Sequence, residues 1–171
     1  MKLASVVAVM FWSLLSMGQE VHVSQGKSSV ALSVLALKPY PWISGEQKTP
    51  ILSVECALKG KKTLHLLKFS PGGALVEDGP EVTAKGGQLP FIMTIGGSKQ
   101  VTSWIPYGDA VSYAYYGKTE PERVKFIEVV LTSGMISIDF KPFLTGVPTT
   151  SSFDLSKLRD EMAKYPECAL E

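Results

Sequence analysis

The sequence predicts an α+β fold: a mainly antiparallel β-sandwich or sheet with one inserted helix and a C-terminal helix. Three observations lead to this expectation. Short segments of alternating apolar and polar residues recur between turns that contain glycine or proline, as in antiparallel sheets. One later segment has the capping residues and apolar spacing of a helix. Cys56 and Cys168 are placed so that a disulfide would join an early strand to the C-terminal segment.

Residues 1–18 have the pattern of a secretory signal peptide. Lys2 precedes an uncharged apolar run from Leu3 to Leu15, and small residues follow up to Gly18. The run is shorter than the roughly 20 residues that a membrane-spanning helix needs, which favours export and cleavage near Gly18 over a retained anchor. We therefore expect a periplasmic or secreted chain that begins near Gln19 and has no stable membrane insertion.

The charge balance argues against a polyanionic partner. The chain has 17 Lys+Arg and 16 Asp+Glu, and Lys2 is the only charge before Gln19, so the expected mature chain has 16 of each sign. A neutral protein lacks long-range attraction for nucleic acid or anionic membrane. The lysine-rich stretch 59–62 is then interpreted as a solvated hairpin turn. No nucleic-acid partner is expected.

About 150 residues remain after the signal segment, which suits a single core. We expect residues 19–48 to form an N-terminal extension or linker, with a first strand in "VALSVLAL". Residues 49–171 are expected to form a single disulfide-tied β-rich domain.

The clearest strand pattern is "ILSVECALKGKKTLHLLKF". Apolar residues and Cys56 alternate with polar or small residues from Leu52 to Leu58, and Leu64 and Leu66 continue the pattern after a Lys-Gly turn. The stretch predicts a hairpin with Cys56 facing inward. His65 is expected to point outward. Further strands are expected in "ALVEDGPEVTAK", "LPFIMTIGG", "KQVTSWI" and "VSYAYYG".

The helical signals come later in the chain. "TEPERVKFIEVVLTSG" begins with Thr119 followed by Glu122, a capping-box spacing, and ends at Gly134. "MISIDFKPF" then alternates as a strand. In "FDLSKLRDEMAKYPEC", Asp154 or Ser156 is expected to cap a short helix that ends just before Cys168. Four residues of that helix are expected to face inward: Leu155, Leu158, Met162 and Tyr165.

Cys56 and Cys168 are the only cysteines. Export would take them into an oxidising compartment, so one structural disulfide is predicted, with two free thiols as the alternative. A redox pair more often has Cys-x-x-Cys spacing, and a zinc site would need more ligands than two cysteines and two scattered histidines. No metal or other cofactor is expected.

The stretch "TSWIPYGDAVSYAYYG" is rich in aromatic residues. Its alternation predicts a hairpin with a turn from Pro106 to Asp109, with Tyr113 and Tyr115 on a buried face and Ala114 and Tyr116 outside. A core hairpin is favoured over a ligand site. The side chains retained as candidates for partner contact are Trp104, Tyr107 and Tyr116.

No residues form a convincing catalytic pattern. The only candidates are Ser24 with Lys27, His65, and the acidic residues Glu77, Asp78 and Glu81. No Gly-x-Ser-x-Gly elbow or phosphate-binding glycine motif accompanies them. Each candidate is better explained as part of a strand or solvated turn, so no catalytic residues are expected.

The order of these features resembles the VasI-like family of exported proteins associated with bacterial type VI secretion. The resemblance runs from Pro50 to Cys168 and is carried by "PILSVECALKGKKTLHL", "SWIPYGDAVSYAYYG", "KFIEVVLTSGMISIDFKPF" and "SSFDLSKLRDEMAKYPEC". Lys157 stands where the family usually has glycine. The resemblance implies a periplasmic accessory role, a disulfide between Cys56 and Cys168, and no catalytic residues.

Three functions are consistent with the sequence. The first is a non-enzymatic exported (periplasmic) accessory or binding protein whose partner is another protein in the envelope or outside the cell. The alternative is an inhibitor or immunity protein directed against a cell-wall hydrolase, since such proteins are also small, exported and disulfide-tied. The third is an enzyme of unfamiliar type that uses the candidates above.

Overall fold

The computed structural model describes residues 19–60, 62–75, 87–107 and 112–170. The expected strand "ALVEDGPEVTAK" lies mostly outside these residues, as do its acidic residues Glu77, Asp78 and Glu81. The strands of the main sheet are β1 (His22–Gln25), β2 (Ser29–Leu35), β5 (Ile51–Lys59), β6 (Lys62–Ser70), β7 (Leu89–Ile95), β8 (Ser98–Tyr107), β9 (Ser112–Tyr115), β10 (Met135–Phe140) and β11 (Thr149–Asp154). The remaining elements are β3 (Tyr40–Pro41), η1 (Ile43–Gly45), β4 (Gln47–Lys48), α2 (Glu120–Thr132), α3 (Leu158–Met162) and η2 (Pro166–Cys168).

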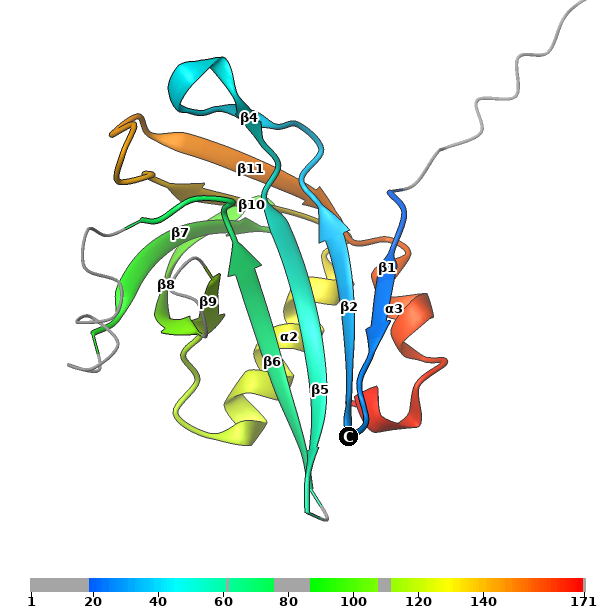
Figure 1. The fold of residues 1–171 in the computed structure, drawn as a ribbon. Helices are drawn as coiled ribbons and strands as arrows, with labels where there is room; N and C mark the ends of the chain where they lie inside the picture. The colour runs from blue at the N-terminus through cyan, green and yellow to red at the C-terminus, as the bar shows by residue number, and fades with distance from the viewer. Residues whose placement is uncertain (1–18, 61, 76–86, 108–111, 171) are drawn as a thin grey trace, which may run out of the picture.

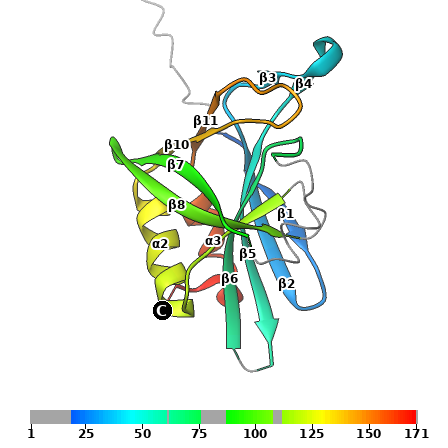
Figure 2. The same cartoon turned by 90° about the vertical axis from the view of Figure 1, so that its left-hand side faces the viewer.

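The main sheet is antiparallel, in the order β1-β2-β5-β6-β9-β8-β7-β10-β11. It curls strongly, which brings Phe69 on β6 edge-to-face against Phe140 on β10 and Phe153 on β11. In Figures 1 and 2, β7 and β8 run across β5 and β6 and α2 lies beneath them. The α+β class with its two helices is confirmed, and its β part is one large curved sheet.

The expected N-terminal extension contributes two strands to this sheet. The alternation of "VALSVLAL" does form a strand, β2, and its Val30, Leu32 and Val34 are buried in the core. β2 pairs with β5 along its whole length. The side chains of Val30, Leu32 and Val34 therefore belong to the same hydrophobic core as those of the later strands.

α2 begins and ends where the sequence predicts. Thr119 is the N-cap residue, and its hydroxyl accepts a hydrogen bond from the Glu122 N–H while the Glu122 carboxylate accepts one from the Thr119 N–H. Gly134 has a left-handed backbone just past the helix. The helix buries Ile127, Val130 and Leu131 against the sheet.

Two expectations at the C-terminus need correction. Asp154, expected as a possible helix cap, instead ends the unexpected strand β11. The buried residues of β11 are Ser151 and Phe153. The helix α3 has Lys157 at its N-cap without a side-chain cap, because the Asp154 carboxylate instead accepts a hydrogen bond from the Ser156 N–H in a local turn.

Leu52, Val54 and Cys56 of β5 face the core as expected, but the phase of β6 differs from the expectation. Leu64 and Leu66 are half-buried, whereas His65, Leu67 and Phe69 face the core. The physical reason is the register: Cys56 lies directly opposite His65, and directly opposed residues share one face of a sheet. His65 is therefore buried with Cys56.

Candidate functional site

The disulfide between Cys56 and Cys168 is formed, with 5.3 Å between the two Cα atoms. Both cysteines are buried. The bond ties β5 to η2 and so holds the C-terminal segment against the sheet. It confirms the pairing expected from the sequence.

The β8–β9 hairpin is largely a core element. Trp104 is 0% exposed, and its indole N–H donates to the Thr102 hydroxyl at 2.8 Å. Its ring packs 5.5 Å from that of Phe91 and 6.4 Å from that of Phe69, between ring centroids. The expectation that Trp104 contacts a partner is therefore wrong: its indole is enclosed and its one donor is satisfied.

β9 continues this packing. Tyr113 is fully buried, and its hydroxyl accepts a hydrogen bond from the Leu75 N–H at 3.1 Å. Tyr115 stacks on Phe126 of α2 with ring centroids 3.9 Å apart, and burial, followed by the charge of Glu122, raises the pKa of its hydroxyl. Ala114, expected outside, is buried. Its neighbours in the sheet register are Ile105 and Lys68, side chains long enough to cover a single methyl group.

The outward side of β7, β8 and β9 carries exposed apolar and aromatic side chains. Val101 is 72% exposed, and Ile92 lies directly opposite it on β7. Tyr107 and Tyr116 are 37% and 39% exposed. We call the set of five residues on this face the outer stripe: Ile92, Val101, Ile105, Tyr107 and Tyr116.

The register shows that the outer stripe is one surface. Val101, Ile105 and Tyr107 alternate with buried residues along β8, so they share a face. Tyr116 follows β9, and its N–H donates to the Ser103 carbonyl. Because Ser103 lies four residues from Tyr107, the two tyrosines are about 13 Å apart along the strand. Sequence reasoning missed Ile92 because the apolar run "LPFIMTI" hides its own alternation, and it missed Val101 because no face was assigned to "KQVTSWI".

Tyr107 is held in place by a charged pair. The Lys68 ammonium lies 4.7 Å from the centre of the Tyr107 ring and 3.1 Å from a carboxylate oxygen of Glu55. Contact between a cation and an aromatic face is attractive. The exposed ring therefore sits on a fixed polar support.

His65 takes part in a partly buried polar cluster with α2. One Glu120 oxygen accepts a hydrogen bond from the His65 backbone N–H at 2.7 Å. The same oxygen lies 3.0 Å from the ring Nδ1 of His65. The other oxygen pairs with the Arg123 guanidinium. Burial acts to raise the pKa of Glu120, but the hydrogen bonds from His65 and Arg123 outweigh it and hold that pKa below its usual value.

The His65 ring is not placed for catalysis. It is almost fully buried, and its Nε2 has no hydrogen-bond partner among the residues that the structure describes. A general base must reach the proton that it removes. The cluster joins α2 to β6. Ser24 and Lys27 are both exposed, in β1 and in the turn after it.

An apolar groove of about 380 Å³ runs between α2 and the C-terminal segment. Its walls include Leu131, Met162, Tyr165, Pro166 and Leu170, and Cys168 lies among them. Glu128 and Arg159 supply charge on opposite sides, from α2 and α3. The disulfide thus shapes this groove by holding one wall in place.

The described residues hold neither a metal-ligand cluster nor a membrane-spanning helix. Within residues 19–60, 62–75, 87–107 and 112–170, no three His, Cys, Asp or Glu side chains gather as metal ligands would. Over the same part of the chain, no helix has the length and apolar character needed to cross a membrane. Comparisons with models of protein families, with curated proteins and with solved structures found no match to this chain.

Proposed function

We propose that this chain is a non-enzymatic exported accessory protein, located in the periplasm, that binds another protein through the outer stripe. The observation that carries the proposal is the exposure of Val101, Ile92, Tyr107 and Tyr116 on one face of a sheet whose other face is core. Contiguous exposed apolar side chains are typical of interaction sites.

The rigidity of this face favours binding. Side chains that alternate with the outer stripe, such as Trp104 and Tyr113, are locked in the aromatic core. The backbone of β8 is also hydrogen-bonded on both sides, to β7 and β9. A preorganised surface loses little conformational entropy on binding, and tyrosine offers large contact area at small entropic cost.

The proposed compartment is supported by the sequence and by the disulfide. The signal-like segment 1–18 supports export, and the Cys56–Cys168 disulfide suits an oxidising compartment. The association with type VI secretion rests on the resemblance to the VasI-like family alone. It forms part of the proposal as the setting in which a partner is sought.

Site-specific crosslinking tests the proposal. A photoreactive amino acid replaces Val101 in the exported protein, and a matched variant carries it at Val23, an exposed apolar position on the edge strand β1. We expect one protein to be crosslinked from position 101 and not from position 23. With that partner purified, Val101→Asp should weaken binding at least about tenfold, because it places a charge in an apolar contact.

The outcomes separate the candidate functions. Equal binding of wild type and Val101→Asp, with Val23→Asp as the control, would remove the outer stripe from the proposal. A crosslinked cell-wall hydrolase whose activity falls on binding would replace the accessory role with the inhibitor role. A crosslink only between copies of this chain would show that the outer stripe is a dimer surface.

A further inference from the structure

Five exposed lysines gather at the end of the molecule where the β5–β6 hairpin and the start of α2 meet. We call this surface the lysine end. They come from four places in the chain: the β1–β2 turn, the two strands of the hairpin, the loop before α2, and α2 itself. The five residues are Lys27, Lys59, Lys62, Lys118 and Lys125.

Strand register brings the first three together. Lys59 and Lys62 lie directly opposite each other at the hairpin tip. The Leu58 N–H donates to the Ser28 carbonyl, so the turn that contains Lys27 reaches the same level of the sheet. The three lysines therefore lie at the same end of neighbouring strands.

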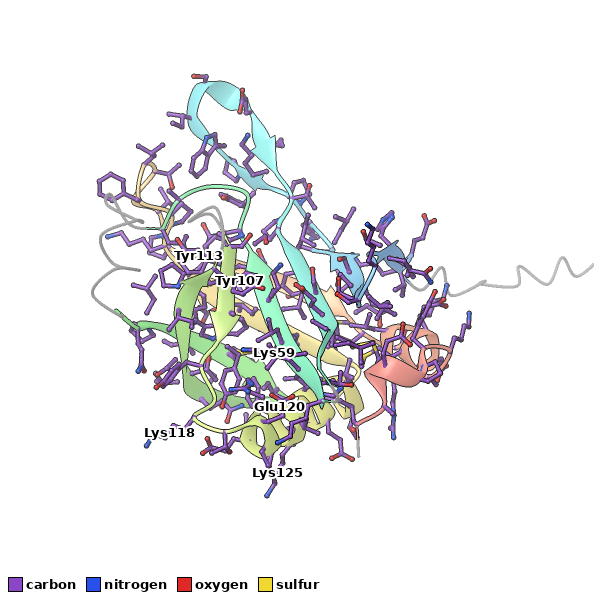
Figure 3. All side chains as sticks on the ribbon, turned by 60° about the horizontal axis from the view of Figure 1, so that its bottom comes forward. Lys59, Tyr107, Tyr113, Lys118, Glu120 and Lys125 are labelled. Carbon is purple, nitrogen blue, oxygen red and sulfur yellow. A yellow bond between two sulfur atoms is a disulfide. The ribbon has the colours of Figure 1, made fainter. Side chains whose placement is uncertain are left out.

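The His65 cluster brings in the other two. Glu120 binds His65, which lies three residues, or about 10 Å, along β6 from Lys62. Lys118 stands two residues before Glu120, and Lys125 lies on the exposed side of α2. Figure 3 shows Lys59, Lys118 and Lys125 on the same end of the molecule, around Glu120.

The carboxylates nearby leave this charge unbalanced. Glu120 is engaged with Arg123 and His65, and Glu122 completes the helix cap. Glu167, the acid of η2, is half-buried on the C-terminal side. Among the residues that the structure describes, these three acids against the five lysines and Arg123 leave three positive charges. None of the five lysines forms an ion pair within the described part of the chain.

The excess of positive charge at the lysine end means that a chain with no net charge can still attract an anionic surface locally. Salt screens charges over about 8 Å at physiological concentration, so a nearby surface responds mainly to the local excess. Like charges placed directly opposite in a sheet destabilise it. The Lys59–Lys62 pair therefore weakens the hairpin unless an anionic surface offsets the repulsion.

We propose that the lysine end adsorbs reversibly to a bilayer surface that contains anionic phospholipids. Leu58, half of whose surface is exposed, stands beside Lys59 at the protruding tip and can enter the interfacial region. Two grooves of the described structure lie elsewhere, along the C-terminal half of α2. Lysines spread over a convex end, without fixed partners, suit a laterally mobile array of phosphates better than a single bound anion.

Vesicle sedimentation tests this proposal. The mature protein is mixed with vesicles of phosphatidylcholine and phosphatidylglycerol in equal parts, and separately with vesicles of phosphatidylcholine alone. Each lysine near an anionic surface is expected to contribute about fivefold to the apparent affinity. Replacing all five lysines by glutamine should lower binding to the anionic vesicles by about a hundredfold or more, and raising the salt concentration should release the wild type.

A matched variant separates local from total charge. It removes five lysines outside the lysine end by the same replacement, at positions Lys38, Lys99, Lys141, Lys157 and Lys164. This variant should bind the anionic vesicles within about twofold of wild type, while circular dichroism confirms that both variants are folded. Equal loss in the two variants, or equal binding to neutral vesicles, would overturn the proposal. Tighter binding to heparin than to the anionic vesicles at the same salt would overturn it in favour of a glycan.

Discussion

The side-chain amide of Gln19 joins two strands that are far apart in the sheet order. Its Nε2 donates to the Leu35 carbonyl at the end of β2, and its Oε1 accepts from the Asp154 N–H of β11 at 3.3 Å. Beside it, the Leu37 N–H donates to the Ser152 carbonyl at 2.9 Å. One side chain therefore helps to close the curl of the sheet.

Gln19→Ala should lower the free energy of unfolding by about 1 kcal/mol, since the partly buried Asp154 N–H and the exposed Leu35 carbonyl both lose their partner. Urea unfolding of the mature chain measures this. The matched control is Gln25→Ala on the exposed strand β1, which should change stability by less than about 0.5 kcal/mol. Equal effects of the two changes would show that the Gln19 bonds contribute nothing.

Glu120 gives stability a dependence on pH. Its pKa is lower in the folded chain than in the unfolded chain, so its ionised form stabilises the fold. That contribution is complete above the ordinary carboxyl range and is lost as the pH falls through the folded pKa. Glu120→Gln should therefore cost about 1–2 kcal/mol at neutral pH, and the difference from wild type should shrink below about pH 4.

Urea unfolding at several pH values measures this prediction. Glu128→Gln, on the exposed side of the same helix, is the control and should stay within about 0.5 kcal/mol of wild type. A difference between wild type and Glu120→Gln that persists unchanged in acid would show that the Glu120 charge does not stabilise the fold.

At this scale, residues whose role depends on near neighbours could be predicted from the sequence. The cap formed by Thr119 and Glu122 is local. The disulfide between Cys56 and Cys168 is not local, but with two cysteines in the sequence the one alternative was a pair of free thiols. His65 was misplaced because the leucines around it suggested the wrong phase. A two-residue turn between Lys59 and Lys62 fixes the register, and counting back from it places His65 opposite Cys56.

At the scale of elements, the β3–β4 hairpin depends on a contact outside itself. Trp42, between β3 and η1, packs on the backbone of Gly73, where a Cβ atom would overlap the indole ring. Tyr40 supports the same end: its hydroxyl donates to the Pro71 carbonyl at 2.9 Å, and burial raises its pKa to about 12. The hairpin is thereby docked on the segment after β6.

Gly73→Ala should displace Trp42 and lower the free energy of unfolding by about 1–3 kcal/mol, as overpacking does. A double-mutant cycle with Trp42→Ala measures the contact. Once the indole is removed, the added methyl group has space, so Gly73→Ala should cost little in that background. Additive costs of the two changes would contradict the overlap.

Elements with clear alternation were predictable, and those without it were not. β10 was expected from its buried Ile136, Ile138 and Phe140. β11 was missed because "TTSSFD" offers one large apolar residue, and its stability comes from pairing with β10. β3 and β4 have two residues each, which is too short for any periodic signal.

At the scale of the whole molecule, pairing between distant segments determines the strand order of the sheet. The β5–β6 and β8–β9 hairpins follow from the sequence, but the contact of β6 with β9, and of β7 with β10 across α2, does not. Such pairings depend on which buried faces fit together after the chain collapses. The outer stripe and the lysine end share this property, since each joins side chains from separate segments, and neither could be found from one stretch of sequence.

The disulfide is the main covalent constraint on this assembly. It closes a loop of 112 residues that includes β6 to α3, so removing it should lower the free energy of unfolding by about 4–5 kcal/mol, mainly by freeing the unfolded chain. Urea unfolding of wild type and of the Cys56→Ala, Cys168→Ala double variant measures the loss. Wild type unfolded under reducing conditions is the control, because it lacks the bond but keeps both side-chain volumes, and it should show nearly the same shift of midpoint. Unchanged midpoints in both samples would mean that noncovalent packing alone holds the C-terminal segment on the sheet.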